Sequence, residues 1–404
     1  SNYNVDFGGR DLKVCFLTET FPPEVNGVAF TLARLARGLS LLNTSVQVLR
    51  PRRAYNGSNH EVWEEIDLPS CRIPNYPQLR FGMPCAGRIK KIWLNNKPDI
   101  VYLATEGPAG FSALRVAKKM KIPVVSGFHT NFDLYLKHYR ISLIKPLVDS
   151  YLRWFHNNTS ATFAPTDWMI SELENKGYKN LRMLSRGVDR MLFSPSERTQ
   201  SLRKQWGVGK DDKVLLTVSR IAAEKNLDLT CSLFEKMIKG GRAKLGVIVG
   251  DGPELIRLSK KFPLLVFTGC LSKTDLAKHY ASSDLFLFSS ETETFGNVVT
   301  EALASGLPVV AYDYAAPSEF IVEGNNGYLA SLGDKNELEE KLIFALQNTK
   351  ETFLQLASLA RDSTERADWD FIFSQFRDDL VDVLNENLNS ISFPKENQYQ
   401  LSHT

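Results

Sequence analysis

The stretch LFLFSSETETFGNVVTEALASGLPVVAY, residues 285–312, has the pattern of one strand, one helix and a second strand. Residues 285–290 and 308–312 are short and nearly continuous in apolar character, and the segment between them has a helical period. Continuous apolar runs are typical of parallel strands that are covered on both faces. The stretch therefore predicts a βαβ unit.

The same alternation continues along the rest of the chain. The predicted strands are 13–19, 45–51, 99–104, 124–130 and 161–165 in the first half, and 213–219, 245–251, 264–269, 285–290 and 308–312 in the second half. Helical patterns of about 10–15 residues separate them, which gives repeated βαβ units. We therefore predict an α/β protein with two doubly wound, Rossmann-like parallel sheets.

The pattern divides the chain into four segments. Glycine, proline and polar residues interrupt it at 185–200, where we place the domain boundary. The predicted segments are an N-terminal domain at 1–188, a C-terminal domain at 189–368, an amphipathic helix at 369–388 and a polar, flexible tail at 389–404.

The composition argues against several classes of protein. Of 404 residues, 43% are hydrophobic and 24% are charged, which is typical of a globular chain with two domains. No apolar run approaches the roughly 18 residues that cross a bilayer, and the first ten residues lack a secretory pattern. None of the five cysteines forms a C-x-x-C pair, and no zinc-binding or Walker A pattern occurs. We expect a reduced, cytoplasmic protein with small buried thiols.

The net charge of +3 conceals an asymmetry between the two halves. Residues 1–188 hold 25 Lys and Arg against 15 Asp and Glu, a net charge of +10, whereas the remainder carries −7. Such a split concerns surfaces and partners rather than fold. We do not expect nucleic acid as a partner, because the overall charge is near neutral and no aromatic-interleaved strand signature occurs.

Two cations follow the first strand of the second half, where ligands of open parallel sheets bind. In VSRIAAEKN, residues 218–226, Arg220 and Lys225 are five residues apart, and Asn226 is placed to cap the next helix. Two cations at a strand end would neutralise a pyrophosphate. The alternative is a pair of solvated surface charges. Two such sheets that face each other would form one deep cleft.

A glycine-rich turn, VGDGPE, occupies residues 249–254 after the next strand. We expect Gly252 to line a nucleotide site in this tight turn. Leu255 stands where the G-x-G-x-x-G fingerprint needs its third glycine, so a dinucleotide site and hydride transfer are not supported.

The first half offers two candidates that also follow strands. Gly27 opens a predicted helix at 28–40, and a glycine there lets backbone N–H groups approach a phosphate. An ordinary strand–helix turn is the alternative. His129 lies at the carboxyl end of the strand predicted at 124–130. It could donate a hydrogen bond to a substrate oxygen, or it could have a structural role.

Two acids flank the helix of the opening stretch. Glu293 lies in the loop, and Glu301 falls in the second helical turn if the helix begins near Phe295. Eight residues advance roughly 80° beyond two full turns, so both carboxylates lie toward one side. The free N–H groups near Phe295 and Gly296 point into the same space. Carboxylates bind vicinal hydroxyls and amides bind phosphate, which together fit a sugar on a nucleotide diphosphate. The alternative is that the acids only stabilise the N-terminus of the helix. This would explain Glu293, but it would explain Glu301 poorly.

These motifs resemble the retaining glycosyltransferases of family four, which have the GT-B fold. The resemblance rests on the E-x7-E pair of Glu293 and Glu301, on R-x3-E-K-N at 220–226, on NGV at 26–28 and on VGDGP, and it covers roughly residues 12–388. HTNFDLYL, YLRWFHN, SRGVD and TETFGNVVTEALASGLPVVAYD look closest to one branch. That branch includes sulfoquinovosyl-diacylglycerol synthases and bacterial lipid α-mannosyl- and glucuronosyl-transferases.

The resemblance implies how the donor phosphates would be held. Arg220 and Lys225 would bind the pyrophosphate, and Gly27 would offer its backbone N–H to a phosphate. Gly252 would line the nucleotide site. Arg186 would touch the phosphate or the acceptor.

The resemblance also implies contacts to the sugars and the base. Glu301 would bind the ribose hydroxyls, and Glu293 would bind the donor hexose beside the amides of residues 295–296. His129 would contact the transferred sugar near its reacting carbon. The base would lie near Cys270 and Leu271 and would be read largely by backbone atoms.

In this family the leaving phosphate takes the acceptor proton on the same face of the sugar, so no protein nucleophile is needed and configuration is retained. The protein would stabilise charge on the departing diphosphate and would orient both substrates as the domains close. No D-x-D motif stands at a strand end, so we expect metal-independent transfer with no cofactor. The GT-B fold also implies that the helix at 369–388 returns to the N-terminal domain.

We expect transfer of a hexose from GDP-mannose or a UDP-hexose to a lipid or lipid-linked acceptor. Residues 80–97 and 137–155 mix cations with apolar side chains, as in proteins that lie on an anionic leaflet. We therefore expect peripheral association with the inner face of the membrane. The alternatives are a solvated basic face, a soluble sugar or protein acceptor, and a non-catalytic module that binds nucleotide sugars.

Overall fold

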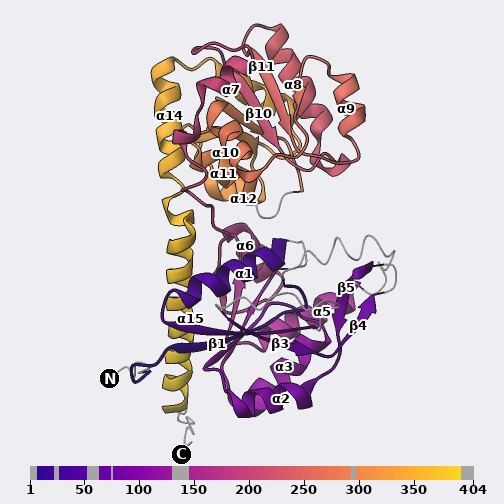
Figure 1. Cartoon of the computed structure of the whole chain (residues 1–404), viewed down its shortest axis with the longest axis vertical. Helices are drawn as coiled ribbons and strands as arrows, with labels where there is room; N and C mark the ends of the chain where they lie inside the picture. Colours follow the sequence, from indigo (N-terminus) through magenta and orange to yellow (C-terminus); the bar gives the residue numbers. More distant parts are fainter. Residues whose placement is uncertain are drawn as a thin grey trace, which may run out of the picture. The chain divides into compact units, whose positions relative to one another are not determined.

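The chain forms two compact units in a computed structural model (Figure 1). Unit 1 comprises Ser1–Pro165, Ile170–Leu184 and Phe373–Thr404, and unit 2 comprises Thr166–Met169 and Ser185–Ile372. The structure describes residues 7–21, 27–51, 63–73, 76–129, 145–292 and 297–392.

Unit 1 is built on a seven-stranded parallel sheet in the order β3-β2-β1-β6-β7-β8-β9. Its strands are β1 Leu12–Leu17, β2 Thr44–Pro51, β3 Glu64–Leu68, β6 Ile100–Leu103, β7 Val124–Gly127, β8 Ala161–Ala164 and β9 Leu181–Met183. Every residue of β6, β7 and β8 is buried, as their continuous apolar character predicts. A two-stranded antiparallel hairpin, β4 Ser70–Ile73 with β5 Tyr76–Gly82, accompanies the sheet.

Helices cover both faces of this sheet. The helices of unit 1 are α1 Gly27–Ser40, α2 Ala86–Asn95, α3 Pro108–Lys119 and α5 Lys145–Asn157. Helix α6 Asp167–Asn175 and helix α15 Trp369–Ser392 each have residues in both units. One core cluster joins Cys15 and Leu17 of the sheet to Trp93 of α2 and Ala113 of α3. On the opposite face, Phe376 of α15 packs against the rings of the sheet.

Unit 2 has a six-stranded parallel sheet in the order β12-β11-β10-β13-β14-β15. Its strands are β10 Val214–Val218, β11 Leu245–Val249, β12 Val266–Phe267, β13 Leu285–Phe288, β14 Val309–Tyr312 and β15 Gly327–Ala330. Its helices are α7 Gln200–Gln205, α8 Leu227–Lys239, α9 Leu255–Lys261, α10 Lys273–Ser282, α11 Asn297–Ala304, α12 Ala315–Phe320, α13 Lys335–Leu346 and α14 Lys350–Asp362. Two hydrophobic clusters fill the two sides of the sheet.

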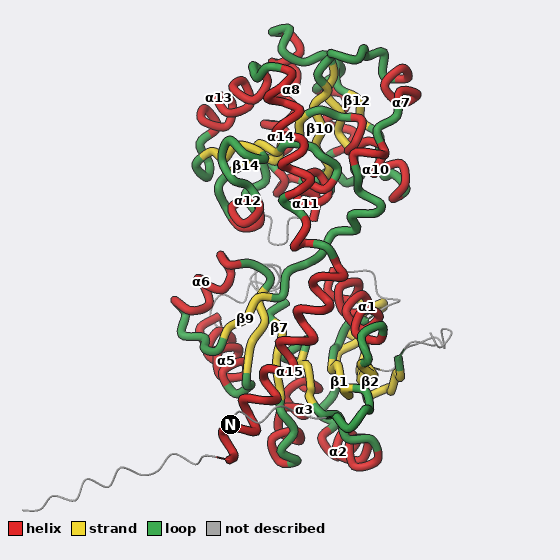
Figure 2. The backbone as a smooth tube through the Cα atoms, turned by 90° about the vertical axis from the view of Figure 1, so that its left-hand side faces the viewer, coloured by secondary structure: helices red, strands yellow, loops and turns green. Residues whose placement is uncertain are grey.

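Both sheets therefore follow one topology. Numbered from its own first strand, each begins 3-2-1-4-5-6, which is the strand order of the Rossmann fold. Figure 2 shows the strands of each unit between helices. The order reverses between β1 and β6 in unit 1 and between β10 and β13 in unit 2, and ligands of such sheets bind beyond the carboxyl ends of the strands at these points.

One expectation about the cysteines is wrong. Cys15, Cys85 and Cys231 are buried thiols, but Cys270 is exposed. Its position explains the difference, because strand β12 ends at Phe267 and Cys270 lies in the loop before α10.

Candidate functional site

Arg220 and Lys225 lie just beyond the carboxyl end of β10, beside the reversal of strand order in unit 2. The Arg220 guanidinium forms an ion pair with Glu224 within the same segment. Arg220 is exposed and Lys225 is partly buried. The structure thus places both cations where an anionic ligand of this sheet would bind.

Asn226 directly follows Lys225 in the left-handed region, with a φ of 55°. The expected side-chain cap is not formed, because no hydrogen bond runs from this side chain to the start of α8. Its Nδ2 instead donates to the Ser289 carbonyl at 3.2 Å, and the Ser289 hydroxyl donates to the Asn226 carbonyl at 3.1 Å. Thr230 also hydrogen-bonds the Ser289 hydroxyl. These bonds fix the segment after β10 to the segment after β13.

The VGDGPE turn lies directly against the backbone of the segment that carries Arg220. A Cβ at Gly250 would stand 1.8 Å from the Ser219 carbonyl oxygen, and one at Gly252 would stand 2.3 Å from the Ile221 carbonyl oxygen. Both glycines also have φ above +130°, a conformation that L side chains rarely adopt. The two glycines therefore have a structural reason as well as the predicted nucleotide role.

Glu301 lies in α11 and accepts a hydrogen bond of 2.9 Å from the hydroxyl of Tyr280 in α10. Tyr280 is completely buried. Burial raises the pKa of Glu301 to about 7, although the bond from Tyr280 acts in the opposite direction. The carboxylate is thus held in one orientation and titrates near neutral pH.

The structure describes Leu271 and Arg186 of unit 2 but not the three other residues that were predicted to contact the donor. Leu271 packs at the edge of a core cluster in the loop before α10. Arg186 is partly buried in the segment that follows β9. Glu293, Phe295 and Gly296 lie outside the described residues, so their predicted roles remain predictions.

In unit 1, His129 stands two residues beyond the end of β7 and is partly buried. Its Nε2 lies 2.6 Å from the hydroxyl of Tyr102, a fully buried residue of β6. Gly27 is the first residue of α1, as expected, and that helix follows the loop after β1.

A buried polar network that includes Ser126 of β7 was not predicted from the sequence. Ser126 of β7 bonds His156 Nδ1 at 2.7 Å, and His156 Nε2 lies 2.9 Å from the Glu106 carboxylate. All three side chains are nearly inaccessible to solvent. The only sequence signal was that Glu106 lies shortly after the strand predicted at 99–104.

Glu19, in the loop after β1, is a second acid that the sequence did not single out. Its carboxylate accepts a backbone N–H from Gly82 at 3.4 Å. A Cβ at Gly107 would stand 2.0 Å from its Oε1, so the glycine before α3 makes room for this acid. Burial raises the pKa of Glu19 to about 7.

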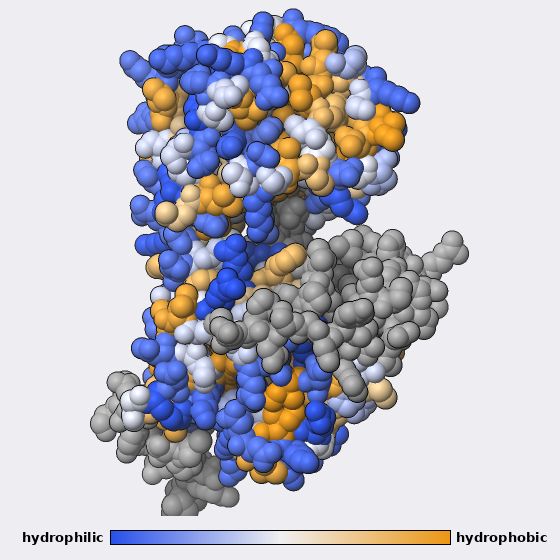
Figure 3. Space-filling view, in the orientation of Figure 1, coloured by the Kyte–Doolittle hydropathy of each residue, from blue (hydrophilic) through white to orange (hydrophobic). Residues whose placement is uncertain are grey.

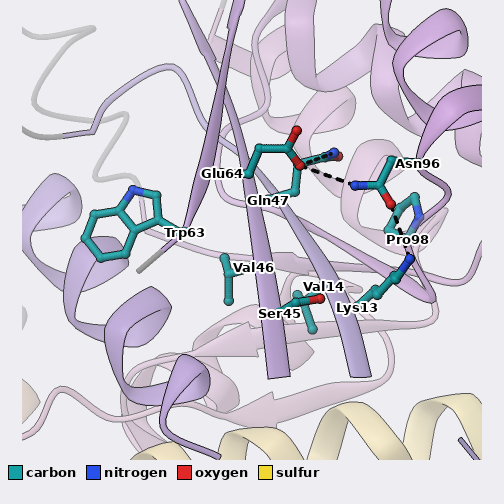
Figure 4. A pocket seen from close by; sticks show the side chains of 9 residues that line it. All are labelled: Lys13, Val14, Ser45, Val46, Gln47, Trp63, Glu64, Asn96 and Pro98. Carbon is teal, nitrogen blue, oxygen red and sulfur yellow. Dashed lines mark hydrogen bonds between the residues drawn. The ribbon is translucent and has the colours of Figure 1, made fainter. Parts of the chain in front are cut away.

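A pocket of about 290 Å³ lies elsewhere in unit 1, at the amino ends of β1 and β2. Figure 4 shows a polar chain along one side, where Gln47 and Asn96 both donate to Glu64 and Lys13 donates to Asn96. None of the predicted site residues lines it. Within the described ranges, no group of three or more His, Cys, Asp or Glu could hold a metal ion. The described helices also include none that is both long and apolar enough to cross a bilayer.

The chain is similar to known glycosyltransferases in both halves of its sequence. Residues 25–191 match the model of glycosyltransferase family 4, and residues 198–362 match that of glycosyl transferases group 1. A GDP-mannose-dependent alpha-mannosyltransferase of Mycobacterium tuberculosis is 31% identical over 89% of this chain and 93% of its own length. An alpha-monoglucosyldiacylglycerol synthase of Streptococcus pneumoniae is 28% identical over 74% of this chain and 71% of its own length.

The fold matches that of a solved structure at low sequence identity. The crystal structure of Anabaena Alr3699/HepE in complex with UDP has a TM-score of 0.71 and 20% identity, and covers 92% of this chain and 100% of that chain. Two Rossmann-like sheets of this kind define the GT-B class of glycosyltransferases. The chain belongs to glycosyltransferase family 4, and it is an enzyme that takes a sugar from a nucleotide-sugar donor.

Proposed function

We propose that this enzyme transfers a hexose from a nucleoside-diphosphate sugar to a lipid or lipid-linked acceptor. It acts with retention of configuration and needs neither a metal ion nor a further cofactor. The observation that carries the proposal is the position of Arg220 and Lys225 at the end of β10, joined through Asn226 and Ser289 to the segment that leads to Glu293.

The side chains of unit 2 support the proposed binding of a nucleoside-diphosphate sugar. Two cations suit a diphosphate, whose negative charge increases as the sugar departs. The Glu301 carboxylate can accept bonds from two vicinal hydroxyls of a ribose. GDP-mannose is the first donor to test, because it appears in the name of the mycobacterial relative, and a UDP-hexose is the second.

The same arrangement supports the proposed independence of a metal ion. Side-chain cations at the diphosphate would take the part that a divalent cation plays in other nucleotide-dependent enzymes. The leaving phosphate would then receive the acceptor proton on the face that it leaves. The product would keep the configuration of the donor.

The lipid acceptor is supported by the synthase relative, whose name includes diacylglycerol, and by the surface of unit 1. Helix α2 exposes Arg88, Lys90 and Lys91, and Leu94 beside them is 66% exposed. On α5, Leu147 and Trp154 are exposed. Figure 3 shows apolar residues among hydrophilic ones over the region of α2 and α3. Cations beside exposed apolar side chains suit peripheral binding to an anionic leaflet, and we place it on the cytoplasmic face.

The proposal is tested by turnover with GDP-mannose and UDP-glucose, with diacylglycerol-containing vesicles or soluble sugars as acceptors. On vesicles, we expect turnover with one of the two donors. This turnover should persist in EDTA, and NMR should show an α-linked product.

Lys225→Ala should remove the thermal stabilisation by that donor. Lys350→Ala, which changes an exposed lysine paired with Asp211, should keep it. Equal donor binding by both variants would overturn the assigned pyrophosphate contact, and transfer only to soluble sugars would overturn the lipid acceptor.

A further inference from the structure

His129 is in hydrogen-bond contact with a tyrosine that carries no predicted role. Tyr102 is completely buried, and its ring packs against Phe16, Phe163 and Phe376 at centroid distances of 5.3, 6.3 and 5.4 Å. The Tyr102 hydroxyl, outside these ring contacts, lies 2.6 Å from His129 Nε2. The packing fixes the ring, so the hydroxyl is a rigid anchor for the imidazole.

Strand geometry and one glycine make this contact possible. Tyr102 of β6 is opposite Val125 of β7, so Tyr102, Val125 and Gly127 share one face of the sheet. A Cβ at Gly127 would stand 2.0 Å from the Tyr102 hydroxyl oxygen and 2.4 Å from His129 Nε2. The Tyr102 side chain therefore occupies the space that the Cβ of any other residue at position 127 would need.

We propose that Tyr102 is a positioning residue that holds His129, through Nε2, in the orientation that sugar transfer requires, and that Gly127 is the opening that permits it. The proposal rests on the transferase activity proposed above, which assigns His129 to the transferred sugar.

The burial of Tyr102 sets the direction of the hydrogen bond. Loss of hydration, with a smaller contribution from the nearby Glu106 charge, raises the pKa of Tyr102 well above its ordinary value, so the phenol keeps its proton. A buried hydroxyl that did not donate would leave its proton unsatisfied. The phenol therefore donates to Nε2, and the neutral imidazole carries its own proton on Nδ1.

The first test is a double-mutant cycle on the full-length enzyme. Tyr102→Phe keeps the packed ring and removes only the hydroxyl, and we expect kcat to fall about 10- to 100-fold with the donor KM little changed. In a His129→Asn background the same change should alter kcat by less than about twofold, because Tyr102 acts through His129. Equal losses in the two backgrounds, or no loss in either, would overturn the proposal.

A control variant and an NMR measurement distinguish the positioning of His129 from a general loss of activity after removal of a buried hydroxyl. Tyr328→Phe removes another buried tyrosine hydroxyl, which accepts from Asn348 in unit 2, and it should leave kcat unchanged. Imidazole ¹⁵N shifts, with His129 assigned by its loss in His129→Asn, should show the Nδ1–H form in the wild type and a shift toward Nε2–H in Tyr102→Phe. Gly127→Ala should shift the same signal. If no donor is turned over, the proposed function fails, while the ¹⁵N shifts still decide this proposal: identical shifts in all three proteins refute it.

Discussion

Asn226 and Ser289 each donate a side-chain hydrogen bond to the other residue's backbone carbonyl, at 3.2 and 3.1 Å. The pair joins the ends of two adjacent strands, β10 and β13, at the reversal of strand order in unit 2. One of these segments carries Lys225, and the other leads to Glu293. The relative placement of the predicted donor contacts therefore depends on an asparagine in a left-handed conformation.

Asn226→Ala and Asn226→Gly should separate the two contributions of this asparagine. Both variants lose the bond from the amide, but only alanine opposes the φ of 55°, at about 1 kcal/mol or more. We expect Asn226→Ala to lower the free energy of unfolding by about 2 kcal/mol and to raise the donor KM, with Asn226→Gly affected less. Urea unfolding and steady-state kinetics measure both. Equal stability of the two variants would show that the backbone conformation adds no constraint.

Glu301 should make both stability and donor binding depend on pH. Its folded pKa of about 7 is raised above the ordinary 4.5, so its contribution to stability is complete below pH 4.5 and is lost as pH rises through 7. Glu301→Gln should therefore have a higher Tm relative to the wild type at pH 8 than at pH 5. The proposed ribose contact needs the carboxylate, so under this proposal the wild-type donor Kd should rise as pH falls below about 7. A Tm difference that does not change with pH would contradict this assignment.

Gly250→Ala should be strongly destabilising, because its Cβ would meet the Ser219 carbonyl oxygen at 1.8 Å. We expect a loss of more than about 2 kcal/mol in the free energy of unfolding, together with weaker donor binding as the Arg220 segment is displaced. Gly241→Ala is the matched control. Gly241 also has a positive φ, of +70°, but nothing lies within 4 Å of its Cβ position, so only about 1 kcal/mol should be lost. Similar losses in the two variants would mean that backbone strain, and not the clash, dominates.

The Glu106 carboxylate and His156 form a buried pair whose disruption should be costly. Glu106→Ala leaves the imidazole N–H without an acceptor and should lower the free energy of unfolding by about 3 kcal/mol. Glu106→Gln keeps an acceptor oxygen and should cost about 1 kcal/mol. Chemical denaturation of the full-length chain compares them. If glutamine is as harmful as alanine, a neutral acceptor oxygen does not replace the carboxylate, and the proposed reason for the smaller loss is wrong.

The sequence predicted the strands that lie inside the sheets better than those at the edges. Strands such as 161–164 and 285–288 are buried at every position, so their apolar runs are continuous and easily recognised. The edge strand β3 reads EEIDL and has a buried residue only at its last position, and β15 contains a glycine. Edge strands tolerate polar residues because only one side is paired, so periodicity alone does not reveal them.

The candidate site was predicted one residue at a time, and its contacts were not. Strand ends pointed to Arg220, Lys225 and His129 because parallel sheets bind ligands there. The bonds from Tyr102 to His129 and from Tyr280 to Glu301 join residues 27 and 21 positions apart on different elements. Such pairs depend on strand register and helix packing, which no local motif encodes.

Arg220, Lys225 and Glu301, which we propose to bind the donor, all belong to unit 2, whereas the Tyr102–His129 pair is wholly contained in unit 1. Engineering can use this separation. A chimaera that receives its 185–372 segment from a relative would exchange the residues that we propose to bind the nucleotide sugar and would leave the Tyr102–His129 pair intact.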